Sequence, residues 1–149
     1  MQRILIALII VMLSSLLIFT ALSSFARNVA LNDWESDLPG YIKSVKLQNS
    51  SDKPIAVFFY TDWCSNCKAL REEVLSSTEV QAFMKDLHPV KINPETSAYE
   101  ETLAQEFGVV GYPSFFIIKQ NGEVVRQIRR TTQISPAQFI SQLRAAIDA

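Results

Sequence analysis

Two cysteines separated by two residues, Cys64 and Cys67, are the residues of this chain best suited to do chemistry. They lie in the stretch TDWCSNCKAL (61–70) and are the only cysteines among the 149 residues. Such a pair could supply half of a zinc site, a short structural disulfide, or a redox couple that alternates between dithiol and disulfide. The rest of the sequence must decide between these three interpretations.

Zinc and a structural disulfide are both weakly supported. A structural zinc site needs four ligands and a catalytic site usually has three from the protein, whereas His88 is the only other soft ligand in the chain. A disulfide that closes so short a loop removes little entropy from the unfolded chain, so it would stabilise the fold poorly. Ligand counting and loop length therefore both leave the redox interpretation ahead.

The elements around the pair support the redox interpretation directly. The preceding run IAVFFY (55–60) is apolar, aromatic and β-branched, which is typical of a strand buried on both faces. The following segment has helical composition, with an expected break near 76–78. Cys64 would then begin a helix, where unpaired N–H groups and the helix dipole stabilise the thiolate that attacks disulfides. Cys67, one turn later, could resolve the mixed disulfide, and no metal or organic cofactor is expected because the two sulfurs hold the electrons.

Helices and strands alternate along the rest of the chain. We expect helices over 41–48 and over SAYEETLAQEFGV (97–109), where Gly108 could end the helix through a left-handed cap. A short strand is expected over PVKIN (89–93). This order predicts an α/β fold with a mixed central sheet and helices on both faces.

The C-terminal third predicts a hairpin followed by a helix. In PSFFIIKQNGEVVRQIR (113–129), two β-prone runs flank Asn121-Gly122, a pair typical of two-residue turns with positive φ at both positions. In the last segment, Ser135 can cap a helix and Gln138 has the spacing of a capping box.

The N-terminal stretch (1–27) carries no charge between the arginines near its two ends. As a helix it could cross a hydrocarbon core of roughly 30 Å, and 24–26 also has small residues at the spacing that signal peptidase accepts. We therefore interpret 1–26 as a membrane anchor or a signal peptide, 27–37 as a linker and 38–149 as the working domain. Both interpretations place that domain outside the cytosol, where disulfides persist.

Length and charge limit the classes of partner. A chain of 149 residues has room for one domain of ordinary size. The formal net charge of −1 gives no basic face for phosphates, so no nucleic acid partner is expected. We expect a monomer.

Several motifs together carry a family resemblance. DWCSNCK (62–68) resembles the WCxxCK motif of the thioredoxin superfamily, and GYPSFFIIKQNGEVV (111–125) resembles its cis-proline segment and the hairpin after it. Two further stretches, at 74–84 and 94–113, add a closer likeness to the C-terminal thioredoxin-like domain of bacterial membrane thiol:disulfide interchange proteins. The resemblance covers about 38–149 and implies a thioredoxin-like fold.

The resemblance implies a role for each matching residue. Cys64 would be the nucleophile and Cys67 the resolving thiol of a redox-active disulfide. Pro113 would be a cis-proline beside this disulfide and would leave the backbone of Tyr112 free to pair with an extended substrate. Trp63 would line the groove that binds this substrate. The alternatives are ordinary aromatic packing for Trp63 and Tyr112, and an ordinary turn proline for Pro113.

Other positions fit the family pattern in part or depart from it. Lys91 would lie beneath the active site behind the resolving thiol, or would be a solvated lysine at a strand end. Thioredoxins commonly carry a buried aspartate six residues before the first cysteine, where this chain has Phe58. Phenylalanine cannot titrate, so the proton of the resolving thiol must leave through water, Lys91 or another group. Thr132 replaces a glycine that relatives often place in the groove loop, and Arg129 and Arg130 lie near the groove mouth or at a solvated strand end.

The implied activity is thiol–disulfide exchange on the periplasmic side of a bacterial inner membrane, with the domain anchored there or released. The substrates would be protein thiols and disulfides, the expected direction is reduction, and an upstream electron donor would restore the dithiol. Alternatives are a disulfide oxidase or isomerase, or a binding and assembly module that holds a partner in the groove. The intact cysteine pair argues against a pure binding module.

Overall fold

The computed structural model describes residues 10–15, 17, 18, 31–129 and 134–148. The elements of its folded part, in chain order, are β1 (Glu35–Ser36), α2 (Asp37–Gln48), β2 (Ile55–Phe59), α3 (Ser65–Ala69), the π-helix η1 (Leu70–Leu75), α4 (Thr78–Met84), β3 (His88–Ile92), α5 (Ala98–Glu106), β4 (Ser114–Ile118), β5 (Val124–Arg129) and α6 (Pro136–Asp148).

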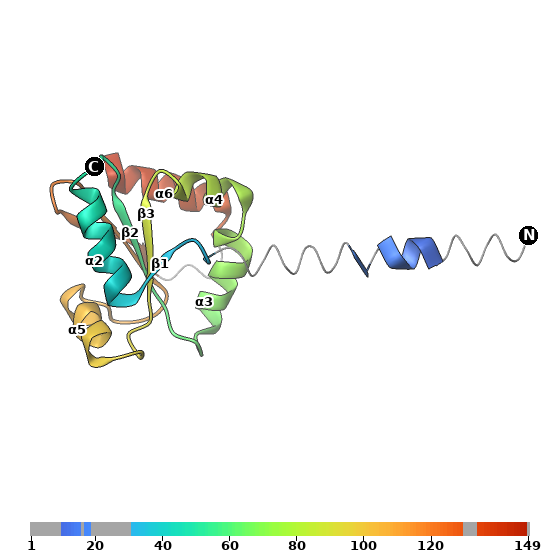
Figure 1. Cartoon of the computed structure of the whole chain (residues 1–149), viewed down its shortest axis with the longest axis horizontal. Helices are drawn as coiled ribbons and strands as arrows, with labels where there is room; N and C mark the ends of the chain where they lie inside the picture. The colour runs from blue at the N-terminus through green and yellow to red at the C-terminus, as the bar shows by residue number, and fades with distance from the viewer. Residues whose placement is uncertain (1–9, 16, 19–30, 130–133, 149) are drawn as a thin grey trace, which may run out of the picture.

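The five strands form one mixed sheet in the order β1-β3-β2-β4-β5. Strand β3 pairs in parallel with both β1 and β2, whereas β4 pairs antiparallel with β2 and β5. Helices α2 and α5 cover one face of the sheet, and α3, α4 and α6 cover the other (Figure 1). The predicted α/β fold with helices on both faces is confirmed.

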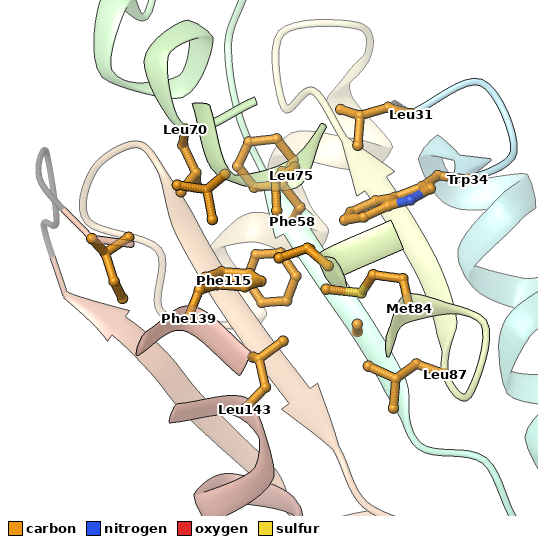
Figure 2. Close-up of a cluster of buried hydrophobic side chains, with 14 of the residues drawn as sticks. Leu31, Trp34, Phe58, Leu70, Leu75, Met84, Leu87, Phe115, Phe139 and Leu143 are labelled. Carbon is orange, nitrogen blue, oxygen red and sulfur yellow. The ribbon is translucent and has the colours of Figure 1, made fainter. Parts of the chain in front are cut away.

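Strand β2 lies at the centre of the sheet and is buried along its whole length. Because side chains alternate between the faces of a strand, Val57 and Phe59 enter the core under α2 and α5, while Phe58 enters the core on the opposite face. Figure 2 shows Phe58 and Phe115 at the middle of this second core, among side chains from η1, α4 and α6. The central strand is thereby fixed from both sides.

The packed domain begins N-terminal to the expected boundary at residue 38. Leu31 and Trp34 are buried, and Trp34 meets the rings of Phe58 and Phe115 edge-on, with centroids 6.4 and 6.2 Å apart. Strand β1 adds parallel pairs with β3. Residues 31–37, which we expected to be part of a linker, therefore belong to the packed structure.

The helix boundaries confirm some expectations and correct others. Helix α2 begins at Asp37, not at 41, and the Asp37 carboxylate accepts a hydrogen bond from the Asn93 N–H at 3.2 Å. The break expected near 76–78 is confirmed, because Ser77 caps α4 by accepting from the Val80 N–H at 3.3 Å. The π-helical turn of η1 before this break was not anticipated.

The predicted two-residue hairpin turn is wrong. Strands β4 and β5 are separated by residues 119–123, and the Lys119 N–H donates to the Glu123 carbonyl at 2.9 Å. Only Gly122 of the Asn121-Gly122 pair has a positive φ, of 80°. Asn121 supports the longer turn differently, because its side-chain oxygen accepts from the Glu123 N–H at 2.9 Å.

Two predicted helix termini are confirmed. Gly108 follows α5 with a φ of 62°, the left-handed conformation expected of a capping glycine. Ser135 and Gln138 form the reciprocal capping box, with the Gln138 N–H donating to the Ser135 hydroxyl at 3.2 Å and the Ser135 N–H donating to Gln138 Oε1 at 3.0 Å.

The anchor or signal peptide expected over 1–26 falls largely on residues outside the described ranges. Within those ranges, no helix is both long and apolar enough to cross a membrane. The nature of 1–26 stays a prediction.

Glu100 joins α5 to α2 and gives the fold a pH dependence. Its carboxylate accepts hydrogen bonds from the Ser97 hydroxyl and, at 3.1 Å, from the Leu38 N–H. The bond from Ser97, followed by the bond from Leu38, holds the pKa of Glu100 below the usual 4.5. Because the pKa is lower in the folded state, the stabilisation is complete above about pH 4.5 and is lost as the pH falls through the folded pKa.

We therefore expect Glu100→Gln to lower the free energy of unfolding by about 1 kcal/mol at pH 7, since a charge-assisted hydrogen bond is replaced by a neutral one. The difference from wild type should shrink in acid, where both side chains are neutral. Urea unfolding at pH 7 and pH 3 measures it, with the exposed neighbour changed in Glu101→Gln as the matched control. A loss that stays the same at both pH values would contradict this role.

Candidate active site

The cysteine pair lies where β2 ends and α3 begins. The Tyr60 N–H still bonds to the Ile92 carbonyl of β3 at 3.1 Å, after which the chain leaves the sheet and turns. The Cys64 N–H closes this turn on the Thr61 carbonyl at 3.2 Å. Cys64 is the N-cap residue of α3, in an extended conformation with φ −73° and ψ 102°. The predicted strand–CxxC–helix arrangement is present.

Cys64 and Cys67 are joined by a disulfide with an S–S distance of 2.13 Å and a Cα–Cα distance of 5.2 Å. Both residues are buried. The Cys67 N–H donates to Cys64 Sγ at 3.0 Å, so the sulfur occupies the place of a helix-capping oxygen. After reduction, the same N–H group and the positive end of the helix would stabilise negative charge on Cys64 Sγ.

Trp63, the residue before Cys64, contacts a second aromatic side chain near the surface. Trp63 is 71% exposed and meets the Tyr112 ring edge-on at 6.3 Å, while its indole N–H donates to Glu95 Oε1 at 2.8 Å. Trp63 is therefore a surface residue held in place, not part of a core. Burial, followed by the charges of Glu95 and Glu101, raises the pKa of Tyr112 above 10.0, so its hydroxyl stays protonated at neutral pH.

Pro113 lies at the same edge of the sheet as the cysteines. Its neighbour Ser114 pairs with Phe59, the last residue of β2, and Pro113 is buried. The peptide bond between Tyr112 and Pro113 is cis. The structure thus brings Trp63 and Tyr112 into contact and places Pro113 at the edge of the sheet from which the CxxC loop departs.

Phe58 is buried in the core on β2, six residues before Cys64. Its ring stacks on Tyr60 and Phe115, with centroids 5.5 and 5.9 Å away. Lys91 is its partner in the parallel register of β3, and the Lys91 ammonium donates to the Leu31 carbonyl at 2.9 Å. Lys91 is half-buried and hydrogen-bonded, so it is not simply a solvated lysine at a strand end.

The described part of the structure places none of the remaining candidate residues at the site. His88 begins β3, opposite Ile55 at the far end of β2, and its Nε2 lies 2.7 Å from the Ser51 hydroxyl. Arg130 and Thr132 lie outside the described residues, as does the side chain of Arg129.

Sequence reasoning missed the polar residues that surround the disulfide. Glu95, which holds Trp63, sits in the loop after β3, and only the fold brings that loop to the CxxC. A small pocket of about 60 Å³ also adjoins the disulfide. It is lined by Phe58, Tyr60, Thr61, Asp62, Cys64, Cys67, Lys68 and Arg71. Lys68 and Arg71 follow Cys64 and Cys67 by four residues each, and this helical spacing was a sequence signal that could have indicated part of the lining.

A mixed sheet whose central strand delivers a CxxC disulfide to a helix N-terminus defines the thioredoxin-like class of fold. Residues 42–147 match the family model of the thioredoxin-like domain, and the chain belongs to this family of thiol:disulfide oxidoreductases, with Cys64 and Cys67 as its cysteine pair.

Curated relatives include the thiol:disulfide interchange protein DsbD of Neisseria meningitidis serogroup A, which is 32% identical over 78 residues. That match covers 51% of this chain and 13% of the relative. DsbD of Haemophilus ducreyi is 26% identical over 99 residues, covering 66% of this chain and 17% of the relative. The chain thus corresponds to a small part of these longer proteins.

Solved structures share the fold. The oxidoreductase DsbH superposes with a TM-score of 0.65 at 24% identity, covering 78% of this chain and 84% of that one. The C-terminal domain of Neisseria meningitidis DsbD in the oxidised form gives a TM-score of 0.64 at 22% identity, covering 76% of this chain and 98% of that one.

Because Cys64 caps α3, we expect its thiol to react faster than the thiol of Cys67 in the reduced protein. We expect the rate at which iodoacetamide alkylates Cys64 to reach half its maximum below about pH 8.5, which is the pKa of an ordinary cysteine thiol. The variant Cys67→Ser should keep this reactivity, whereas Cys64→Ser should react about tenfold more slowly at pH 7 because its remaining thiol is not at the helix N-terminus. Equal rates for the two variants would contradict the assignment of the nucleophile.

Proposed function

We propose that this protein is an extracytoplasmic thiol–disulfide oxidoreductase that reduces disulfide bonds in other proteins. The observation that carries the proposal is the Cys64–Cys67 disulfide at the N-terminus of α3, with Cys64 Sγ accepting the Cys67 N–H. Cys64, which caps α3, is therefore the better nucleophile of the two cysteines, and Cys67 lies one turn later in the helix.

The reaction proceeds through a mixed disulfide. The Cys64 thiolate attacks one sulfur of the substrate disulfide, a Cys64–substrate bond forms, and the other substrate sulfur leaves as a thiolate that takes up a proton. Cys67 then loses its proton and attacks Cys64 Sγ. The substrate leaves with a second thiol, and two electrons have passed from the dithiol to the substrate. The protein is left with the disulfide seen in the structure.

The substrate groove proposed here lies beside Trp63 and Tyr112. Trp63 offers an exposed apolar ring held by Glu95, and Tyr112 adds a half-buried ring against it. The backbone of Tyr112 immediately precedes Pro113 and β4, at the end of the strand nearest the CxxC loop. An extended segment of substrate can pair with the backbone there. Val110, two residues before Tyr112, is also an exposed apolar residue, with 89% of its surface accessible.

The location and the partners are proposed from the sequence and from the likeness to the interchange proteins. An export segment over 1–26 would hold the domain on the periplasmic side of the inner membrane, or release it there. The protein would act as a monomer on thiols and disulfides of other proteins. Because each turnover leaves a disulfide, an upstream dithiol donor must return two electrons to the pair.

Substrate reduction and trapping test this function. Wild-type protein with dithiothreitol as the donor should accelerate insulin reduction, and Cys64→Ser should lower that acceleration by at least about a hundredfold because the attacking thiolate is gone. Cys67→Ser should instead accumulate a covalent complex with its substrate. Mass spectrometry of complexes captured in cells would identify the partners. Wild-type activity in Cys64→Ser would contradict the proposed function.

A further inference from the structure

Thr61 carries a buried hydroxyl that has no hydrogen-bond partner among the described residues. The residue is 2% exposed, and its backbone carbonyl binds the Cys64 N–H, so it is fixed within the turn that presents the cysteines. A buried hydroxyl without a partner costs free energy, which makes each such group worth explaining. In the part of the chain described, Ser44 on α2 is the other side chain of this kind.

The surroundings of Thr61 point to a ligand for its hydroxyl. The residue lines the pocket of about 60 Å³ whose wall also includes Cys64 and Cys67. This volume is large enough for at least one water molecule, and the lining has the polar groups that a bound water needs. The lining of this pocket therefore includes both cysteines and Thr61, the residue whose hydroxyl has no partner among the described residues.

The chemistry of the pair requires a proton route at this place. Cys67 must lose its proton before it can attack Cys64 Sγ, and a neutral thiol is a poor nucleophile. Phe58 cannot accept this proton, and the ammonium of Lys91 is hydrogen-bonded to the Leu31 carbonyl. The pocket is the polar region that remains next to the disulfide.

We propose that the Thr61 hydroxyl holds a water molecule in this pocket and that the proton of the Cys67 thiol leaves through it during resolution of the mixed disulfide. The proposal rests on the proposed thiol–disulfide exchange. In this step the S–H bond of Cys67 breaks, its proton passes to the water, and a proton of that water passes to bulk solvent. The Cys67–Cys64 bond forms while the Cys64–substrate bond breaks, and the substrate sulfur leaves with the electron pair as a thiolate that takes up a proton from solvent. Thr61 is a positioning residue that acts through the water.

The charged groups around the pocket suit this direction of proton transfer. Lys68 on α3 and Arg71 on η1 line the pocket with positive charge and favour a thiolate there. Asp62 is exposed, with one carboxylate oxygen 3.3 Å from the donating Asn93 side-chain amide, and offers an acceptor at the solvent side.

Tyr60 completes the lining as a neutral hydroxyl. Burial, followed by the charges of Asp37 and Asp62, raises its pKa above 10.0 against an opposing effect of Arg71. Tyr60 can therefore hydrogen-bond to a water in the pocket at neutral pH without itself ionising.

Reaction of the reduced full-length chain with one equivalent of 5,5′-dithiobis(2-nitrobenzoate) in a stopped-flow instrument tests the proposal. The first nitrothiobenzoate released reports attack by Cys64, and the second reports resolution by Cys67. In Thr61→Val we expect the second phase to slow about tenfold at pH 7, with its pH–rate profile moved up by about one unit. The first phase should change less than about twofold, because Cys64 is already a thiolate when it attacks.

Two further variants make the outcome decisive. Thr61→Ser keeps the hydroxyl and should restore the second phase to within about twofold of wild type, while Ser44→Ala removes the other buried hydroxyl and should leave both phases unchanged. The proposal is overturned if Thr61→Val resolves at the wild-type rate at every pH, if it slows both phases alike, or if Thr61→Ser behaves as Thr61→Val. A wild-type protein that releases fewer than two equivalents would instead contradict the exchange function itself.

Discussion

The burial of β2 on both faces, together with its pairing on both edges, is the constraint on which the site depends. A strand held in this way cannot shift, so the turn after Phe59 starts from a fixed point. The hydrogen bonds from Cys64 to Thr61 and from Cys67 N–H to Cys64 Sγ then set the sulfur at the first turn of α3. Strand β4 pairs with the same strand and brings Pro113 to the same edge. One central strand thus positions both halves of the site.

The aromatic core beneath this strand changes how the site can handle protons. Phe58 stacks on Phe115 and Tyr60 and meets Trp34 edge-on, so the position that holds a carboxylate in many thioredoxins contributes packing in this chain. Replacing an ionisable group with a ring removes the cost of burying a charge, and it also removes a proton acceptor. The polar groups beside the disulfide line the same small pocket as this ring and include Thr61, whose hydroxyl has no partner among the described residues. Stability of the core and proton transfer are thereby assigned to different residues.

Local patterns predicted the parts of the structure that depend on local physics. The apolar run at 55–60 predicted β2, the Ser135–Gln138 spacing predicted a capping box, and CxxC after a strand predicted the helix N-terminus at Cys64. Features set by distant contacts were missed. The burial of Trp34 depends on Phe58 and Phe115, and the hold of Glu95 on Trp63 joins residues 32 apart in sequence. The Asn121-Gly122 pair suggested a tight turn, but the Asn121 side chain supports a longer one.

Whether the Cys64–Cys67 bond is an exchanging couple is the central claim, and an equilibrium redox titration of the full-length chain in dithiothreitol buffers tests it most directly. The fraction of disulfide, counted by mass after alkylation, should follow a reversible two-electron transition with a midpoint between about −300 and −120 mV, the range of thioredoxin-fold catalysts. A pair that stays oxidised well below about −300 mV, as structural disulfides do, would contradict the claim.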